Sequence, residues 1–316
     1  MNLFVDILTR VTLPIIALAA LGYLLQPWLK LEIGTLTRLQ VNVVMPAFLV
    51  HFLSTGKQPL DIVWALATLS MIQFAILVPL GWALVFVFRQ RASLGPGMGL
   101  GAAYANVGFF GIPITQLAFG PEYLLHQSVL TAMVTIQLCT IGVWLLNPGE
   151  NASGASFGAR LRKLWTKFRT AFETPLIPSV ALGLALRYYQ IELPPLVSQP
   201  LQLLGLIFTP LALYTLGAQI RAAGAMRFEL VPQTIILLLK LLIAPLLTLY
   251  LCQALKIPPD VTAVVVVAAA TPVGVLLTIF AAEFKSEPEF ISAAAVITTA
   301  LSPLTVTAWI IAMQVM

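Results

Sequence analysis

The chain has 316 residues, of which 59% are hydrophobic and only 9% are charged. A soluble domain carries about 25% charged residues, so this composition excludes an ordinary water-soluble protein and indicates an integral membrane protein. The net charge of +5 does not indicate nucleic-acid binding, because the basic residues are spread over short loops. Cys139 and Cys252 lie within apolar segments and are interpreted as core residues. We expect no disulfide, no metal site and no cofactor.

Apolar segments of membrane-spanning length recur along the whole chain. A bilayer core of roughly 30 Å needs about 20 residues of helix. The sequence therefore predicts an all-α membrane protein with ten transmembrane helices, of which the sixth is short. Their approximate ranges are 4–26, 35–55, 61–88, 97–120, 122–147, 174–190, 196–219, 231–254, 261–283 and 289–313.

The basic residues of the loops predict the orientation. The loops that follow the odd-numbered spans hold 12 of the 17 lysines and arginines, and the opposite side holds four. The positive-inside rule predicts a multi-pass protein of the cell membrane with both termini outside and the 148–173 loop in the cytoplasm. That loop is rich in glycine and serine, then basic and amphipathic, so we expect a short surface helix on anionic lipid.

The two halves of the chain resemble each other. Residues 1–147 and 174–316 each hold five spans, on either side of the 148–173 loop. An odd number of spans places the second copy upside down, and inverted repeats with an interrupted helix in each copy are typical of secondary transporters. Three proline pairs keep a similar separation between the halves: Pro14 and Pro178 (164 residues), Pro46 and Pro210 (164), and Pro79 and Pro245 (166).

The fourth span contains a sequence that continuous helix fits poorly. Gly108 and Gly111 favour bending, Pro113 cannot donate to the helix ladder, and Asn106 brings an amide to membrane depth. Irregular backbone inside a bilayer is tolerated only where it is buried in protein or lines a wet cavity. This stretch is therefore a candidate transport site.

The ninth span holds the counterpart, with Thr271, Pro272 and Gly274. Pro113 and Pro272 each suit the first position of a helix that restarts after an interruption, and Thr271 suits the N-cap. Both restarted helices then aim their N-termini at the membrane centre, where unpaired N–H groups and partial positive charge favour an anion. The alternative is that both prolines only kink packed helices.

Lys240, in the eighth span, is the only charged residue deep within a predicted span. It is interpreted as a fixed cation beside the site, or alternatively as a lysine that snorkels or donates to carbonyls. Gln73, in the corresponding third span, is a further candidate ligand. All 12 acidic residues lie in loops or near span ends, which argues against proton or sodium exchange. Secondary polar candidates, each better explained by helix packing than by ligand binding, are Asn42, His51, Thr115, Gln116 and Gln137.

Three segments resemble the auxin efflux carrier family, which includes plant carriers and bacterial organic-acid permeases: residues 106–113, 42–46 and 271–275. The resemblance covers the whole chain, and the short 148–173 loop is similar to that of prokaryotic members. It implies two inverted five-helix repeats with broken, crossing helices 4 and 9, as in bile-acid sodium symporters. It also implies an elevator-type cycle, a homodimer, and substrate carboxylate binding around Asn106. Leu276 and Leu277 depart from the family, whose members often carry asparagine there.

The sequence predicts a secondary transporter that moves a small organic anion, a carboxylate or an auxin-like amphipathic acid, by alternating access. The alternative is a sodium-coupled symporter of bile-acid-like anions. An intramembrane enzyme is not supported, because no His-Glu-x-x-His pattern and no pair of membrane aspartates is present. The expected partners are the organic anion, the lipid bilayer and a second copy of the chain, with no nucleic acid.

Overall fold

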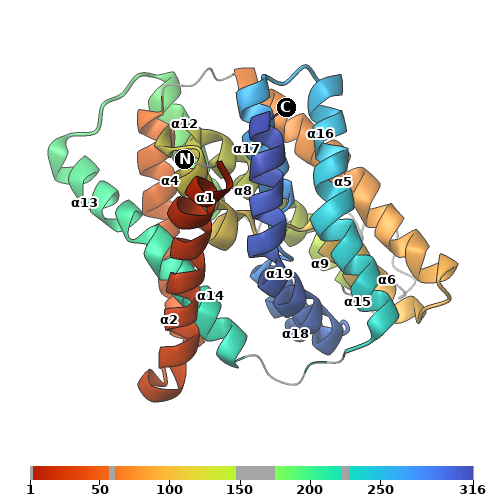
Figure 1. Ribbon diagram of the computed structural model, residues 1–316. Helices are drawn as coiled ribbons and strands as arrows, with labels where there is room; N and C mark the ends of the chain where they lie inside the picture. Colours follow the sequence, from red (N-terminus) through yellow and green to blue (C-terminus); the bar gives the residue numbers. More distant parts are fainter. Residues whose placement is uncertain (1–2, 57–60, 147–174, 223–225, 227, 316) are drawn as a thin grey trace, which may run out of the picture.

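The computed structural model describes residues 3–56, 61–146, 175–222, 226 and 228–315 (Figure 1). These residues form helices without a strand, and their single extended pairing is an antiparallel bridge between Ala105 and Val273. The predicted all-α class is therefore confirmed for this part of the chain. The expected surface helix in the 148–173 loop lies outside the described residues.

The elements of the first half run as far as Leu146 and include four π turns (η1, η2, η4, η6) and two 3₁₀ turns (η3, η5). They are α1 (Leu3–Ile7), η1 (Leu8–Thr12), α2 (Leu13–Leu29), α3 (Ile33–Leu39), η2 (Gln40–Val44), α4 (Met45–Thr55), α5 (Asp61–Val87), η3 (Ala92–Leu94), α6 (Gly95–Ala103), η4 (Val107–Gly111), α7 (Ile112–Ala118), η5 (Pro121–Tyr123), α8 (Leu124–Gln137), η6 (Leu138–Gly142) and α9 (Val143–Leu146).

The second half begins at Leu176 and adds one more π turn, η7. Its elements are α12 (Leu176–Tyr188), α13 (Pro195–Leu206), α14 (Phe208–Ala222), α15 (Leu230–Leu238), η7 (Leu239–Ile243), α16 (Ala244–Ala254), α17 (Pro259–Ala269), α18 (Val275–Glu283) and α19 (Pro288–Val315).

Seven helices of the described chain are long and apolar enough to cross a membrane, and each coincides with a predicted span. They are Val5–Leu29, Ile33–Thr55, Asp61–Val87, Pro121–Leu146, Pro195–Ala222, Leu230–Ala254 and Pro288–Val315. Shorter apolar helices occupy the other three predicted spans: Val107–Ala118, Leu176–Tyr188 and Pro259–Ala269.

Prolines widen several of these helices without interrupting them. Pro14, Pro46, Pro113 and Pro245 each occupy the second position of an α-helix that directly follows a five-residue π turn. Proline lacks an N–H group, and its ring clashes with the carbonyl of the residue four positions earlier. The preceding turn relieves this clash by widening to π geometry, so one span continues through the proline.

The helices form two groups (Figure 1). In the first group, α2 packs on α14, and α4 packs on α12 and α13. In the second group, α5 packs on α6, α8 and α16, whereas α19 packs on α15, α17 and α18. Contacts of α8 with α4 and α12, and of α14 with η4 and α7, join the two groups.

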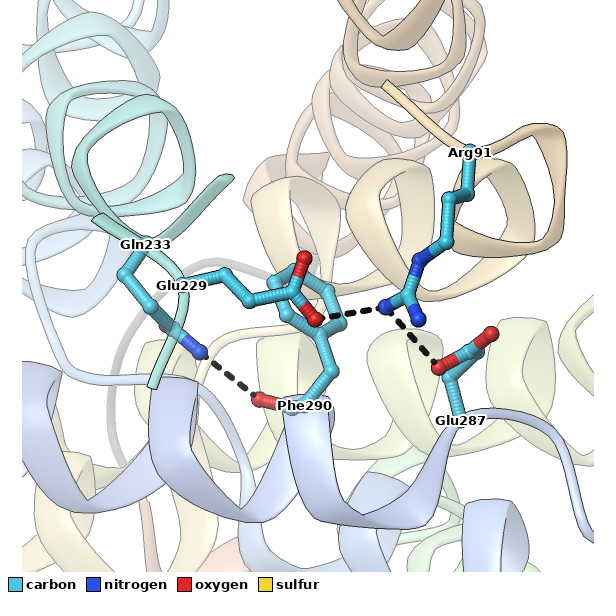
Figure 2. A network of polar contacts seen from close by, with 5 residues as sticks. All are labelled: Arg91, Glu229, Gln233, Glu287 and Phe290. Carbon is cyan, nitrogen blue, oxygen red and sulfur yellow. Dashed lines mark hydrogen bonds and ion pairs between the residues drawn. The ribbon is translucent and has the colours of Figure 1, made fainter. Parts of the chain in front are cut away.

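Polar side chains from three connections between helices meet at one end of the second group (Figure 2). Arg91, between α5 and α6, places Nη2 2.6 Å from Oε1 of Glu229 and 3.4 Å from Oε2 of Glu287. These glutamates directly precede α15 and α19. Close by, Gln233 donates from Nε2 to the carbonyl oxygen of Phe290 at 3.2 Å. The starts of α6, α15 and α19 are thereby tied together.

Candidate binding site between the two interrupted helices

The fourth and ninth predicted spans are both interrupted, and the interruptions bond to each other. Helix α6 ends at Ala103 and the chain becomes helical again at Val107, whereas α17 ends at Ala269 and α18 begins at Val275. The Asn106 N–H donates to the carbonyl oxygen of Pro272 at 2.8 Å, and the Gly274 N–H donates to that of Tyr104 at 3.1 Å. The two breaks therefore form one hydrogen-bonded unit.

Glycine is required where the two breaks meet. A Cβ at Gly274 would overlap the Tyr104 ring, which is buried against it. A Cβ at Gly111 would overlap the amide of Gln127, which donates from Nε2 to the Val107 carbonyl at 2.6 Å. Both glycines permit close approach of another residue. The predicted bend at Gly108 and Gly111 is wrong, because both lie inside the restarted helix, after the break.

The predicted restart positions are also wrong. Pro113 lies seven positions after Asn106 and follows the π turn that it widens, and Pro272 lies within the break itself. Thr271 does not cap α18, because its hydroxyl donates backwards to the Ala268 carbonyl at 2.7 Å. Gly274 occupies the N-cap position of α18 without a side-chain cap.

Several donors beside the breaks lack an acceptor within the described chain. The carbonyl of Asn106 accepts from Phe110 and Gly111, which leaves the first three N–H groups of the restarted helix unbonded. The Asn106 side chain is only 4% exposed, and its Nδ2 has no hydrogen-bond partner. The unbonded backbone N–H groups belong to Val107, Gly108, Phe109, Val275 and Leu276.

These donors border a cavity of about 50 Å³. Apolar groups of Met45, Phe109 and Leu276 form part of its wall, and the hydroxyls of Thr131 and Thr135 lie on α8. A cavity of this size holds a few water molecules. Buried N–H donors with an apolar wall are suited to an anionic group that carries an apolar body.

A larger cavity of about 690 Å³ adjoins the small one and shares Thr37, Val275 and Ile279 with it. Its volume is that of a typical small-molecule site. At its mouth Nη2 of Arg38 lies 3.6 Å from Oε1 of Glu32, and both side chains are exposed. This mouth lies on the side that the basic loops predict to be cytoplasmic.

Lys240 and Gln73 do not line either cavity. Lys240 has no exposed surface, and its Nζ donates to the carbonyl oxygen of Ala269 at 3.0 Å, which agrees with the alternative interpretation of a lysine that donates to a carbonyl. Gln73 is partly buried within α5.

Two secondary candidates lie away from the breaks. Asn42 is exposed and donates from Nδ2 to the Arg38 carbonyl at 2.9 Å. The His51 ring packs edge-on against Phe52, with centroids 5.0 Å apart. Both contacts stay within the Ile33–Thr55 helix, as expected for packing or interface residues.

The other three secondary candidates bond between helices. Thr115 donates to Oε1 of Gln127 at 3.0 Å, which fixes the amide that in turn holds the Val107 carbonyl. Gln116 accepts from the Thr209 hydroxyl at 2.6 Å, and Gln137 donates to a serine of α5 at 3.1 Å. Only Thr115 is therefore connected to the break, through Gln127.

The sequence interpretation missed Gln127, Thr131 and Thr135 of α8. All three are buried; the first holds the break, and the two threonines line the small cavity. Their signal was a spacing of four residues, which places three polar side chains on one face of the fifth span. Gln137, the candidate predicted in this span, bonds instead to a serine of α5.

An apolar helical protein with interrupted helices beside a deep cavity is of the membrane transporter class. The chain matches the family model described as "Membrane transport protein" over residues 7–310, and it belongs to this family, the auxin efflux carrier family. The resemblance found in the sequence is thereby confirmed. A protein of Methanothermobacter thermautotrophicus, described as an uncharacterized transporter, is 25% identical over an alignment that covers 95% of this chain and 97% of the relative.

Proposed function

We propose that this protein is a secondary transporter that binds a small organic anion at the paired interruptions and moves it by alternating access. The observation that carries the proposal is the group of unbonded donors around Asn106, which is buried and borders a cavity. Buried donors without acceptors are unfavourable by about 1–3 kcal/mol each, so a ligand that supplies acceptors is strongly favoured. A carboxylate supplies two oxygen atoms with about four lone-pair positions.

The helix ends add electrostatic support to the proposal. The N-termini of Val107–Ala118 and of α18 meet at the break, and an α-helix N-terminus carries roughly half a positive charge. The apolar wall of Met45, Phe109 and Leu276 suits the hydrocarbon or aromatic part of an amphipathic acid. The substrate class that we propose is therefore a monocarboxylate with an apolar body.

The arrangement of the two helix groups supports an elevator-type movement. Both breaks belong to the second group, whereas Thr37, Val41 and Met45 of the first group form the facing wall of the cavity. Sliding of the second group along this wall would transfer the site from the cytoplasmic cavity to the opposite side. Under this proposal the chain consists of two inverted five-helix repeats with crossing helices 4 and 9, each of the two groups takes helices from both repeats, and the protein is a homodimer in the cell membrane.

The test is a thermal-shift screen of the purified protein against mono- and dicarboxylates and indole-type acids, each with sodium or with choline as the cation. A ligand of the folded state raises the apparent melting temperature. Hits are then followed as radiolabelled substrates in proteoliposomes. We expect saturable uptake that Asn106→Ala strongly reduces. Binding of the neutral carboxamide as tightly as of the acid would contradict an anion site, and dependence on sodium would favour symport.

A further inference from the structure

Lys240 is a buried lysine with a single hydrogen-bond acceptor in the described chain. Its side chain is fully buried, and Nζ donates to Ala269, the last residue of α17. No carboxylate within the described residues forms an ion pair with it. A buried ammonium group is unfavourable unless its environment supplies compensating negative potential.

Local sequence explains how Lys240 reaches this position. It lies in π turn η7, which directly precedes α16, and Pro245 is the second residue of that helix. The carbonyl that Pro245 leaves without a helix partner is that of Leu241, and it accepts instead from Nε1 of Trp309 at 3.0 Å. Helix α19 therefore supplies the hydrogen bond that the Leu241 carbonyl lacks within its own helix. The lysine side chain is directed to the neighbouring end of α17.

The carbonyl end of α17 is bonded internally apart from Ala269. The Ala270 N–H lies 3.1 Å from the carbonyls of Val266 and Val267, and Thr271 donates to Ala268 through both N–H and hydroxyl. A helix C-terminus carries partial negative charge and favours a cation. Half-helix carbonyl ends within membranes are positions where transporters coordinate soluble cations.

We propose that Lys240 is a resident cation, which occupies the carbonyl end of α17 in place of a soluble cation and balances the negative charge of a solute bound at the other side of the same break. It acts as a positioning residue, because it touches backbone and lies outside the cavity. The corresponding helix of the first half, α5, carries no charge beyond Asp61 in its first turn, and its candidate Gln73 is a neutral amide. The assignment of Lys240 as a resident cation does not depend on the proposed function. Its role in balancing the charge of a bound solute does rest on the proposed function.

The experiment compares three variants of the purified protein by thermal unfolding without substrate. Lys240→Gln keeps a donor for Ala269 but removes the charge, Lys240→Met removes both, and Lys240→Ala also opens space. We expect all three to melt below wild type, with Lys240→Gln close to Lys240→Met. Wild-type stability retained by Lys240→Gln would overturn the proposal, because a neutral hydrogen bond would then suffice.

Chemical rescue tests the charge directly. Propylammonium chloride should raise the melting temperature of Lys240→Ala saturably, whereas 1-propanol, which fills the same space without charge, should not. Wild type and Gln73→Ala should respond to neither. Equal rescue by both compounds, or by neither, would overturn the resident cation. If Lys240→Ala cannot be purified, sodium and choline chloride at equal ionic strength are compared on Lys240→Gln, which sodium alone should stabilise.

These measurements leave the transport proposal untouched, because no organic anion is present. A second measurement tests the charge balance. In a competition assay, acetate and acetamide are each used to displace a bound anion that the screen has identified. Lys240→Gln should lower the affinity for the anion at least tenfold and leave that for the neutral amide unchanged. An equal loss for both would assign Lys240 a structural role only.

Discussion

Asn106 has a hydrogen-bonded backbone and a side-chain donor without a partner in the described chain. Its backbone N–H and carbonyl are both bonded, to Pro272 on one side and to Phe110 and Gly111 on the other, so its position is fixed. Its side-chain amide is buried and has no partner for Nδ2. The unused buried donor lowers the stability of the fold. Because the residue is fixed, this donor is already positioned for a ligand.

We predict that Asn106→Ala weakens anion binding by roughly 10- to 100-fold, the equivalent of one hydrogen bond to a charged group. Its melting temperature without ligand should stay at or slightly above that of wild type, because an unsatisfied donor is removed. Asn106→Asp should bind still less, since it places a negative charge against the anion. Isothermal titration and thermal unfolding separate the two effects, and a large loss of stability in Asn106→Ala would contradict this interpretation.

Two glycines at the site allow a matched comparison. A Cβ at Gly274 would meet the fixed ring of Tyr104, whereas one at Gly108 would lie 3.1 Å from the flexible end of Met45. We expect Gly274→Ala to destabilise the protein by about 1–3 kcal/mol and Gly108→Ala by clearly less. Tyr104→Leu should partly restore Gly274→Ala, as a double-mutant cycle of melting temperatures would show. Equal effects of the two alanines would be unexpected.

At the scale of the helix, the sequence predicts most of the architecture. Long apolar segments set the seven long spans, because membrane thickness fixes their length. The prolines were less informative: Pro113, like Pro14, Pro46 and Pro245, follows a π turn, and it lies after the break rather than at it. The breaks are placed by hydrogen bonds between residues more than 150 positions apart, such as Asn106 and Pro272. Local sequence therefore located the breaks to within a few residues but misplaced the caps of the helices that follow them.

Helix α19 holds the second break in position. The hydroxyl of Thr298 accepts from the Val273 N–H at 3.1 Å and donates to the Ala294 carbonyl at 2.7 Å. Thr298→Val keeps the shape and removes the acceptor, so we expect a loss of about 1–3 kcal/mol from the stranded N–H group. Thr298→Ser, which keeps the hydroxyl, should remain near wild type. Thermal unfolding and anion affinity of both variants are the measurements.

For the whole molecule, the ion pairs of Arg91 join three helices at one end of the second group. The side chains are partly exposed, so each pair contributes at most about 1 kcal/mol. We expect Arg91→Ala to lower the melting temperature in low salt, and the difference from wild type to shrink in high salt as screening increases. Arg10→Ala, which removes an exposed pair within one helix, should have little effect in either condition.

The predicted orientation places the larger cavity on the cytoplasmic side. Ser292 lies in this cavity, and Glu192 lies exposed in the connection between α12 and α13. A membrane-impermeant maleimide should label Ser292→Cys in inside-out vesicles only and Glu192→Cys in right-side-out vesicles only. Both native cysteines are buried, so wild type serves as the unlabelled control. Reversed labelling would show that the positive-inside assignment is wrong for this chain.

The pairing of Tyr104 with Gly274 and of Asn106 with Pro272 limits how a bound solute can leave. Pulling the two half-helices apart would strand four backbone groups far from water, at a cost of several kcal/mol. Release of the solute by separation of the two half-helices is therefore disfavoured. Under the proposed elevator-type movement, the solute is released when the facing helices are displaced, while the hydrogen-bonded unit of the two breaks moves intact.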